Sequence, residues 1–212
     1  MKIKKLGHCC LAIEVNGKRV LTDPGSYTII EQEMEKNIDL IVITHEHQDH
    51  LHTASLKNII INNPDAIVVT NRGVGKILGD AGIKYKKLED GQSGEFAGVL
   101  LEGHGDKHAE IYEEFGQVQN TGYFIGQDLF YPGDSFTNPG KKMEILALPV
   151  LGPWLKIKES IDYAIALNPR KCFPVHDWNI KIPGIVHKTP SVILSEHKIE
   201  FKVLELGKEE DL

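Results

Sequence analysis

Short apolar runs alternate with helical patterns along the chain, and turn residues separate them. Weak alternation over 11–15, followed by Asn16-Gly17, predicts a hairpin whose second strand spans 18–22. The apolar run 39–44 is typical of a strand that is buried on both faces. Further strands are predicted over 66–70, within 84–101, and over 122–126, 129–131, 144–149, 172–175 and 200–206.

Helical patterns occupy several of the gaps between these strands. Helices are predicted over 31–37, 51–62, 71–81, 157–167 and 191–198. The acidic tail 209–211 is expected to fray. The pattern therefore predicts a strand-rich α/β chain in which polar residues follow strand ends, where ligands bind in many such folds.

Composition narrows the class of protein. The chain has 212 residues, a formal net charge of −6 and an apolar fraction of 41%, and its acidic balance argues against nucleic-acid binding. Three cysteines exclude a disulfide framework and indicate reduced, intracellular thiols. No apolar run follows the basic start, and none reaches the ~18 residues of a membrane span. We expect a cytoplasmic protein with neither a membrane nor a nucleic-acid partner.

Histidine is the exceptional residue, with 10 in the chain. The segment 44–50, Thr-His-Glu-His-Gln-Asp-His, directly follows the predicted buried strand. In an extended chain His45, His47 and Asp49 lie on one side, and a following turn can bring His50 to a neighbouring position. Imidazole and carboxylate ligands suit Zn²⁺, Mn²⁺ or Fe. The alternative interpretation is a solvated, histidine-rich loop.

One such segment cannot complete a metal shell, so further ligands must come from elsewhere. The candidates that follow apolar runs are His104, His108, Asp134 and His176. Each is weak alone, because a single histidine is more often structural and an aspartate between Gly133 and Ser135 is typical of a turn. Their shared placement after strand ends favours a metal site.

Several segments, in order, resemble the motifs of the metallo-β-lactamase superfamily. They are 44–50, 105–111, 120–123, 131–135 and 174–177, and the opening pieces 6–8, 16–17 and 21–25 also fit. The resemblance covers nearly the whole chain and is strongest to a compact branch of uncharacterised hydrolases and ascorbate-phosphate-lactonase-like proteins. It implies one domain over 1–212 with an αβ/βα four-layer sandwich and a two-metal site along one edge.

The same resemblance implies a ligand set and a chemistry. It places His45, His47 and His108 on one divalent ion, Asp49, His50 and His176 on the other, and Asp134 between them. Zinc is the expected metal, with Mn or Fe as alternatives. The implied reaction is hydrolysis of an ester, lactone, amide or phosphoester of a small molecule by a hydroxide activated between the ions. Asp49 would orient that water and accept a proton.

Other interpretations stay open at this stage. The chain could instead be a metal-binding sensor or scaffold with little turnover, or a mononuclear iron oxygenase. His108 is favoured over His104 as the ligand of the third motif, because its context resembles that motif. His8 is interpreted as structural or as part of the site rim, Asp23 as a turn residue or a ligand-orienting one, and Trp154 as a pocket cover or a core aromatic.

Overall fold

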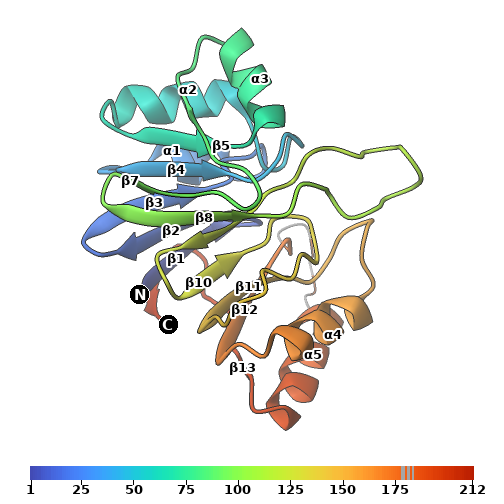
Figure 1. Cartoon of the computed structure of the whole chain (residues 1–212). Coiled ribbons are helices and arrows are strands. Elements are labelled where there is room, and N and C mark those ends of the chain that lie inside the picture. The colour runs from blue at the N-terminus through green and yellow to red at the C-terminus, as the bar shows by residue number, and fades with distance from the viewer. Residues whose placement is uncertain (178–179, 181, 183) are drawn as a thin grey trace.

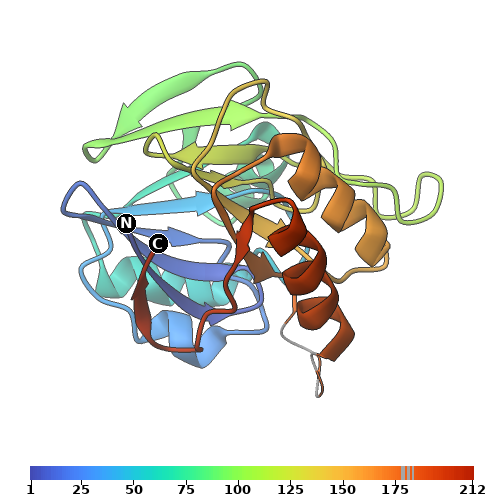
Figure 2. The ribbon, with the colours of Figure 1, turned by 90° about the horizontal axis from the view of Figure 1, so that it is seen from below.

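Two stacked β-sheets carry helices on their outer faces (Figure 1; Figure 2). This computed structural model describes residues 1–177, 180, 182 and 184–212. Within these residues each sheet has seven strands, ordered β14-β1-β2-β3-β4-β5-β6 and β13-β12-β11-β10-β9-β8-β7. The predicted α/β four-layer sandwich is confirmed.

The first sheet combines an antiparallel and a parallel half. Strands β1 to β3 pair antiparallel, whereas β3 to β6 run parallel. Its strands are β1 (Lys2–Gly7), β2 (Cys10–Val15), β3 (Lys18–Thr22), β4 (Leu40–Ile43), β5 (Ile67–Thr70), β6 (Lys86–Lys87) and β14 (Glu209–Asp211). The helices that accompany it are α1 (Ile29–Glu33), α2 (Thr53–Asn62) and α3 (Arg72–Asp80).

The second sheet is organised in the same way. Strands β7 to β10 pair antiparallel and β10 to β13 run parallel. Its strands are β7 (Ser93–Phe96), β8 (Val99–His104), β9 (Gly122–Ile125), β10 (Leu129–Tyr131), β11 (Ile145–Pro149), β12 (Lys171–Val175) and β13 (Glu200–Phe201). Helices α4 (Ile157–Leu167) and α5 (Gly184–Glu196) pack on its outer face.

Strand β4 shows why a continuous apolar run is needed in this fold. Leu40 and Val42 belong to the core between the sheets, whereas Ile41 and Ile43 belong to the core under α2 and α3. Successive side chains of a strand point to opposite faces, so a strand between two cores must be apolar at every position. Full burial of each side chain contributes roughly 1.5–3 kcal/mol.

Several predicted boundaries differ from the structure. The first helix begins at Ile29 rather than at 31, and the last one spans Gly184–Glu196 although it contains Pro190. The final predicted strand is reduced to Glu200–Phe201. The acidic tail does not fray, because Glu209–Asp211 pairs with β1. No helix among the residues that the structure describes is long and apolar enough to cross a bilayer.

The parallel strands determine where polar side chains gather. Strands β3 and β4 of one sheet and β10 and β12 of the other each lead into a loop that carries candidate ligands. The long connection 105–121, between β8 and β9, projects from the body of the molecule (Figure 1). These loops meet at one edge of the sandwich.

Candidate metal centre

The loop after β4 turns back on itself within the histidine motif. The backbone N–H groups of His50 and Leu51 both donate to the carbonyl of His47, at 2.9 and 2.8 Å. Gly25 lies against this turn, and a Cβ on it would sit 1.8 Å from the carbonyl oxygen of Asp49. Only glycine allows so close an approach of two backbones. The turn places Asp49 in a different group of potential ligand atoms from His45 and His47.

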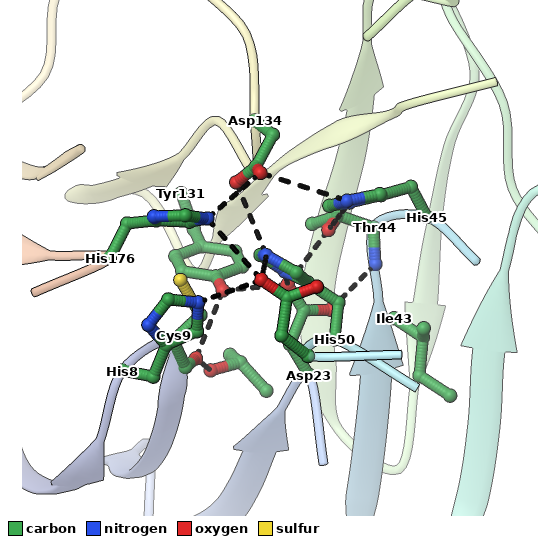
Figure 3. Close-up of polar contacts among 12 residues, drawn as sticks. His8, Cys9, Asp23, Ile43, Thr44, His45, His50, Tyr131, Asp134 and His176 are labelled. Carbon is green, nitrogen blue, oxygen red and sulfur yellow. Dashed lines mark hydrogen bonds and ion pairs between the residues drawn. The ribbon is translucent and has the colours of Figure 1, made fainter. Parts of the chain in front are cut away.

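Two groups of four potential ligand atoms lie side by side at this edge. The first is formed by His45, His47, His108 and Asp134, and the second by His8, Asp49, His50 and His176. Within each group all ligand atoms lie within 4.8 Å of one another. The seven ligands expected from sequence are thus brought together, and His8 joins them. Figure 3 shows Asp134 with His45, His50 and His176 around it.

Asp134 lies between the two groups. Its Oδ2 is 3.8 Å from Nε2 of His45, 3.4 Å from Nε2 of His108 and 3.0 Å from Nε2 of His176. Its Oδ1 is 3.2 Å from Nε2 of His50. The backbone N–H of Asp134 donates to Oδ1 of Asn120 at 3.0 Å, which fixes the loop that carries it. One carboxylate therefore faces imidazoles of both groups.

The buried atoms of the two groups fit divalent cations. The Nε2 atoms of His45, His50 and His108 and the Oδ1 of Asp134 are buried with no hydrogen-bond partner among the described residues. Buried polar atoms nearly always have a partner, and unsatisfied ones indicate an unseen water or ion. Nitrogen and carboxylate donors in groups of four match the shell of a zinc-like ion.

The charge balance of the site also suits cations. Burial opposes ionisation of Asp134, but His50 and His176 hold the pKa of that carboxyl well below its usual value. Burial acts to lower the pKa values of His50 and His176, yet Asp134 keeps both well above the usual range. Burial and neighbouring histidines lower the pKa values of His45 and His47. His45 and His47 therefore offer neutral imidazoles, whereas His50 and His176 would release protons when a cation binds.

Asp23 orients ligands from beneath, at the end of β3. Its side chain is fully buried, and Oδ2 lies 2.7 Å from Nδ1 of His50. The backbone N–H and the hydroxyl of Thr44 donate to its two oxygens, both at 2.7 Å, and the Tyr131 hydroxyl donates at 2.7 Å. Of the two interpretations left open for Asp23, this geometry favours the orienting one. Tyr131 was missed, because nothing in an apolar strand distinguishes a tyrosine that faces a site.

The sequence did not indicate that His8 lies within the second group. It lies in the turn after β1, not on a strand, with a φ of 48°, and its side chain is buried. Its Nε2 is 3.0 Å from Oδ2 of Asp49, and its carbonyl accepts from the backbone N–H of His176 at 3.2 Å. Burial lowers the pKa of His8 to about 4, despite the hydrogen bond to Asp49. Neutral His8 thus contacts two other members of the second group.

The two candidates of the third motif have different surroundings. His104 is the last residue of β8, and its ring meets that of Phe124 edge-on at 5.5 Å, outside both groups. His108 lies in the first group, and its Nδ1 donates to the carbonyl of Ala109 at 2.5 Å, which leaves Nε2 for Asp134. The geometry therefore favours His108.

Trp154 closes the site from the segment after β11. Its indole N–H donates to Oδ2 of Asp134 at 3.0 Å, and its ring meets those of His108 and His176 edge-on. It is buried, yet it also lines a cavity of about 590 Å³ over the two groups. Trp154 is therefore both a buried aromatic and a cover of the pocket, the two interpretations that the sequence left open.

The chain matches a known protein family over most of its length. The beta-lactamase superfamily domain matches residues 2–176. Protein Rv0786c of Mycobacterium tuberculosis is 30% identical over 181 residues, which are 83% of this chain and 84% of the relative. The UPF0173 metal-dependent hydrolase PH1671 of Pyrococcus horikoshii is 27% identical over 99% of this chain and 98% of its own.

Solved structures share the fold. A candidate metal-dependent hydrolase from Parabacteroides distasonis superposes with a TM-score of 0.79 at 21% identity, over 96% of this chain and 92% of the other. Igni18, a metallo hydrolase from Ignicoccus hospitalis, gives 0.78 at 20% identity, over 100% and 98%. The match to the superfamily domain spans most of the chain and every strand from β1 to β12, and the chain belongs to the β-lactamase superfamily.

Proposed function

We propose that this metal-dependent hydrolase of the β-lactamase superfamily works with two divalent ions, zinc foremost and Mn or Fe as alternatives. The observation that carries the proposal is the position of Asp134, whose two oxygens face imidazoles of both ligand groups. A carboxylate with that environment suits a bridge between two cations, which lie ~3.5–4 Å apart in such centres. The whole chain, 1–212, would form the one catalytic domain.

Each ion would have its own protein ligands. His45, His47 and His108 would hold one ion, Asp49, His50 and His176 the other, and Asp134 both. His8 is close enough to the second group to hold Asp49 in place through its 3.0 Å contact. When bound, two such ions acidify a water and polarise the oxygen of a scissile ester, lactone, amide or phosphoester bond.

The chain's own groups would orient the water and shield the site. Asp49 lines the cavity, and contacts with His8 and His176 outweigh burial and keep its pKa below the usual value. It is therefore an ionised carboxylate that can orient a water by accepting a hydrogen bond, a role that its lowered pKa favours over that of a proton acceptor. Trp154 covers Oδ2 of Asp134 and keeps bulk water away from that side of the carboxylate.

The test combines metal analysis with hydrolysis. The purified protein is freed of metal with a chelator, reloaded with Zn²⁺ or Mn²⁺, and assayed with chromogenic esters, lactones and phosphodiesters. We expect no turnover without metal, restored turnover with it, and none in Asp134→Ala. Metal binding without turnover of any probe would favour the sensor or scaffold alternative. One iron with oxygen consumption would favour an oxygenase.

A further inference from the structure

The cavity over the ligand groups has two apolar walls. One is the projecting segment between β8 and β9, which contributes Ile111 and Phe115, and the other is the segment after β11, which contributes Leu151, Pro153 and Trp154. The floor is polar and consists of the ligand groups themselves. At about 590 Å³ the cavity has the size of a small-molecule site.

The two walls differ in how firmly they are held. Trp154 is anchored by its bond to Asp134 and by an edge-on contact with Phe136 at 5.4 Å. Phe115 is 73% exposed, although phenylalanine is normally buried. An exposed aromatic ring at the mouth of a cavity gains free energy when an apolar ligand covers it. The cavity therefore has one apolar wall, at Trp154, that is held in place by contacts within the protein. The other wall, at Phe115, has a ring that is largely exposed to solvent.

Lysine and arginine are absent from the described residues that line this cavity, so the groups there that could carry or hold positive charge are the ligand groups of its floor. A second cavity, which shares His108 with this one, is lined by Arg72 and Lys107. A substrate with an anionic group away from its scissile bond would place that group against apolar side chains or near Asp49. Burial of an unpaired charge in such a place is costly.

We propose that the site accepts uncharged substrates in which an apolar chain or ring flanks the scissile carbonyl, and disfavours substrates with a second, anionic group. The inference rests on the proposed hydrolytic function of the same site. It narrows the substrate from the four bond types to uncharged esters, lactones or amides and excludes phosphorylated ones. The apolar group would lie between Phe115 and Trp154.

The first experiment measures kcat/KM of the zinc-loaded full chain for 4-nitrophenyl acetate, butyrate and hexanoate. A matched probe, the 4-nitrophenyl monoester of succinic acid, has the length of the butyrate ester and a terminal carboxylate. We expect kcat/KM to rise about two- to fourfold for each buried methylene. We expect the succinate ester to react at least tenfold more slowly than the butyrate ester. A flat series, or a preference for the succinate ester, would overturn the inference.

The matched variants are Phe115→Ala and Tyr112→Ala. Both rings are exposed and lie on the same segment, where the N–H of Phe115 donates to the carbonyl of Tyr112 at 2.8 Å, but only Phe115 lines the cavity. Phe115→Ala should flatten the dependence of kcat/KM on chain length. Tyr112→Ala should keep the full dependence. Equal effects of the two variants would show that the ring of Phe115 does not contact the substrate.

A binding series separates this inference from the proposed function. Dissociation constants of 2-butanone, 2-hexanone and 2-octanone, which carry a carbonyl but no hydrolysable bond, report on the apolar wall without turnover when measured by titration calorimetry. We expect tighter binding with each added methylene, and a weaker trend in Phe115→Ala. If no ester is hydrolysed but this trend is present, the hydrolytic proposal fails and the apolar site stands. If esters are hydrolysed and the trend is absent, the apolar site fails alone.

Discussion

The carboxylate of Asp23 holds His50, with Oδ2 lying 2.7 Å from Nδ1 and both side chains fully buried (Figure 3). The same oxygen accepts the hydroxyl of Thr44, whose Oγ1 lies 3.0 Å from Nδ1 of His45. Because Nδ1 of each ring has a partner, each Nε2 is left to face Asp134. One carboxylate therefore fixes the orientation of a ligand in each group.

Replacement of this carboxylate should weaken both metal sites. In Asp23→Asn the amide keeps the shape but no longer offers a charged acceptor to His50 and Thr44. We expect the affinity for both ions to fall about 10–100-fold, the usual effect of losing a residue that orients ligands. The free energy of unfolding should fall by about 1–3 kcal/mol, because buried donors lose their acceptor. Competition with a chromophoric chelator and urea unfolding measure the two effects.

Thr44→Val provides the matched control for Asp23→Asn. It has nearly the same volume and removes only the hydroxyl that links Asp23 to His45. The contact between Asp23 and His50 should persist. We therefore expect weaker binding of one ion and near-normal binding of the other. Equal weakening of both ions by Thr44→Val would contradict the orientation scheme.

Loss of Asp134 should be more severe than loss of any single histidine. Its two oxygens face both ligand groups, so Asp134→Ala should release both ions and abolish hydrolysis while the fold survives. Circular dichroism and metal analysis check these outcomes, with Asp128→Asn, an exposed turn residue, as the control. Activity retained within about tenfold, a change of only ~1.4 kcal/mol in the barrier, would rule out a bridging role.

The two histidines of the third motif allow a direct comparison. His108→Ala should lower the affinity for one ion by more than about 100-fold, because a lost ligand costs more than a lost orienting residue. His104→Ala should leave metal content unchanged, since its ring packs on Phe124 and Phe130 outside both groups. Metal analysis of the two purified variants decides the matter. The opposite result would assign the ligand to His104.

Local pattern is enough to predict most of the fold, and it misses features that depend on contacts between distant segments. The strand β4 was evident because every position is apolar. The acidic sequence of the tail predicts fraying, but its backbone pairs with β1, with Asp211 opposite Lys2 and Glu209 opposite Lys4 in the strand register. Two of its acidic side chains also bind cationic side chains outside the tail, Glu209 to Arg19 at 3.5 Å and Glu210 to Lys202 at 3.0 Å. The paired strands β1 and β14 lie more than 200 residues apart, so no local pattern could join them.

The last helix illustrates a second kind of failure. The sequence predicts its start after Pro190, because proline removes a backbone donor within a helix. The structure continues the helix through this residue, and Val186, Pro190 and Leu194 are all buried on one side of it. Four-residue spacing places these three side chains in one stripe against the second sheet. Tertiary packing therefore outweighs the local cost of the proline.

The site residues, like the elements of the fold, can be predicted from sequence only where a local pattern marks them. The motif from His45 to His50 and the residues after strand ends could be selected from sequence alone. The roles of His8 and Trp154 could not, since each acts through a contact with a carboxylate far along the chain, Asp49 and Asp134 respectively. Three non-glycine residues of the site, His8, Asp23 and His176, have positive φ values that composition does not reveal. Such backbone strain is typical of functional sites.

Two ligand groups predict two ions, and variants in each group should separate them. Titration of metal-free protein should saturate at two divalent ions per chain. His47→Ala removes a half-buried ligand of the first group, and His176→Asn changes the second while asparagine tolerates the positive φ of 61°. Each variant should bind one ion tightly, whereas the double variant should bind none. Saturation of the unaltered protein at a single ion, with no second site at higher metal concentration, would refute the dinuclear centre.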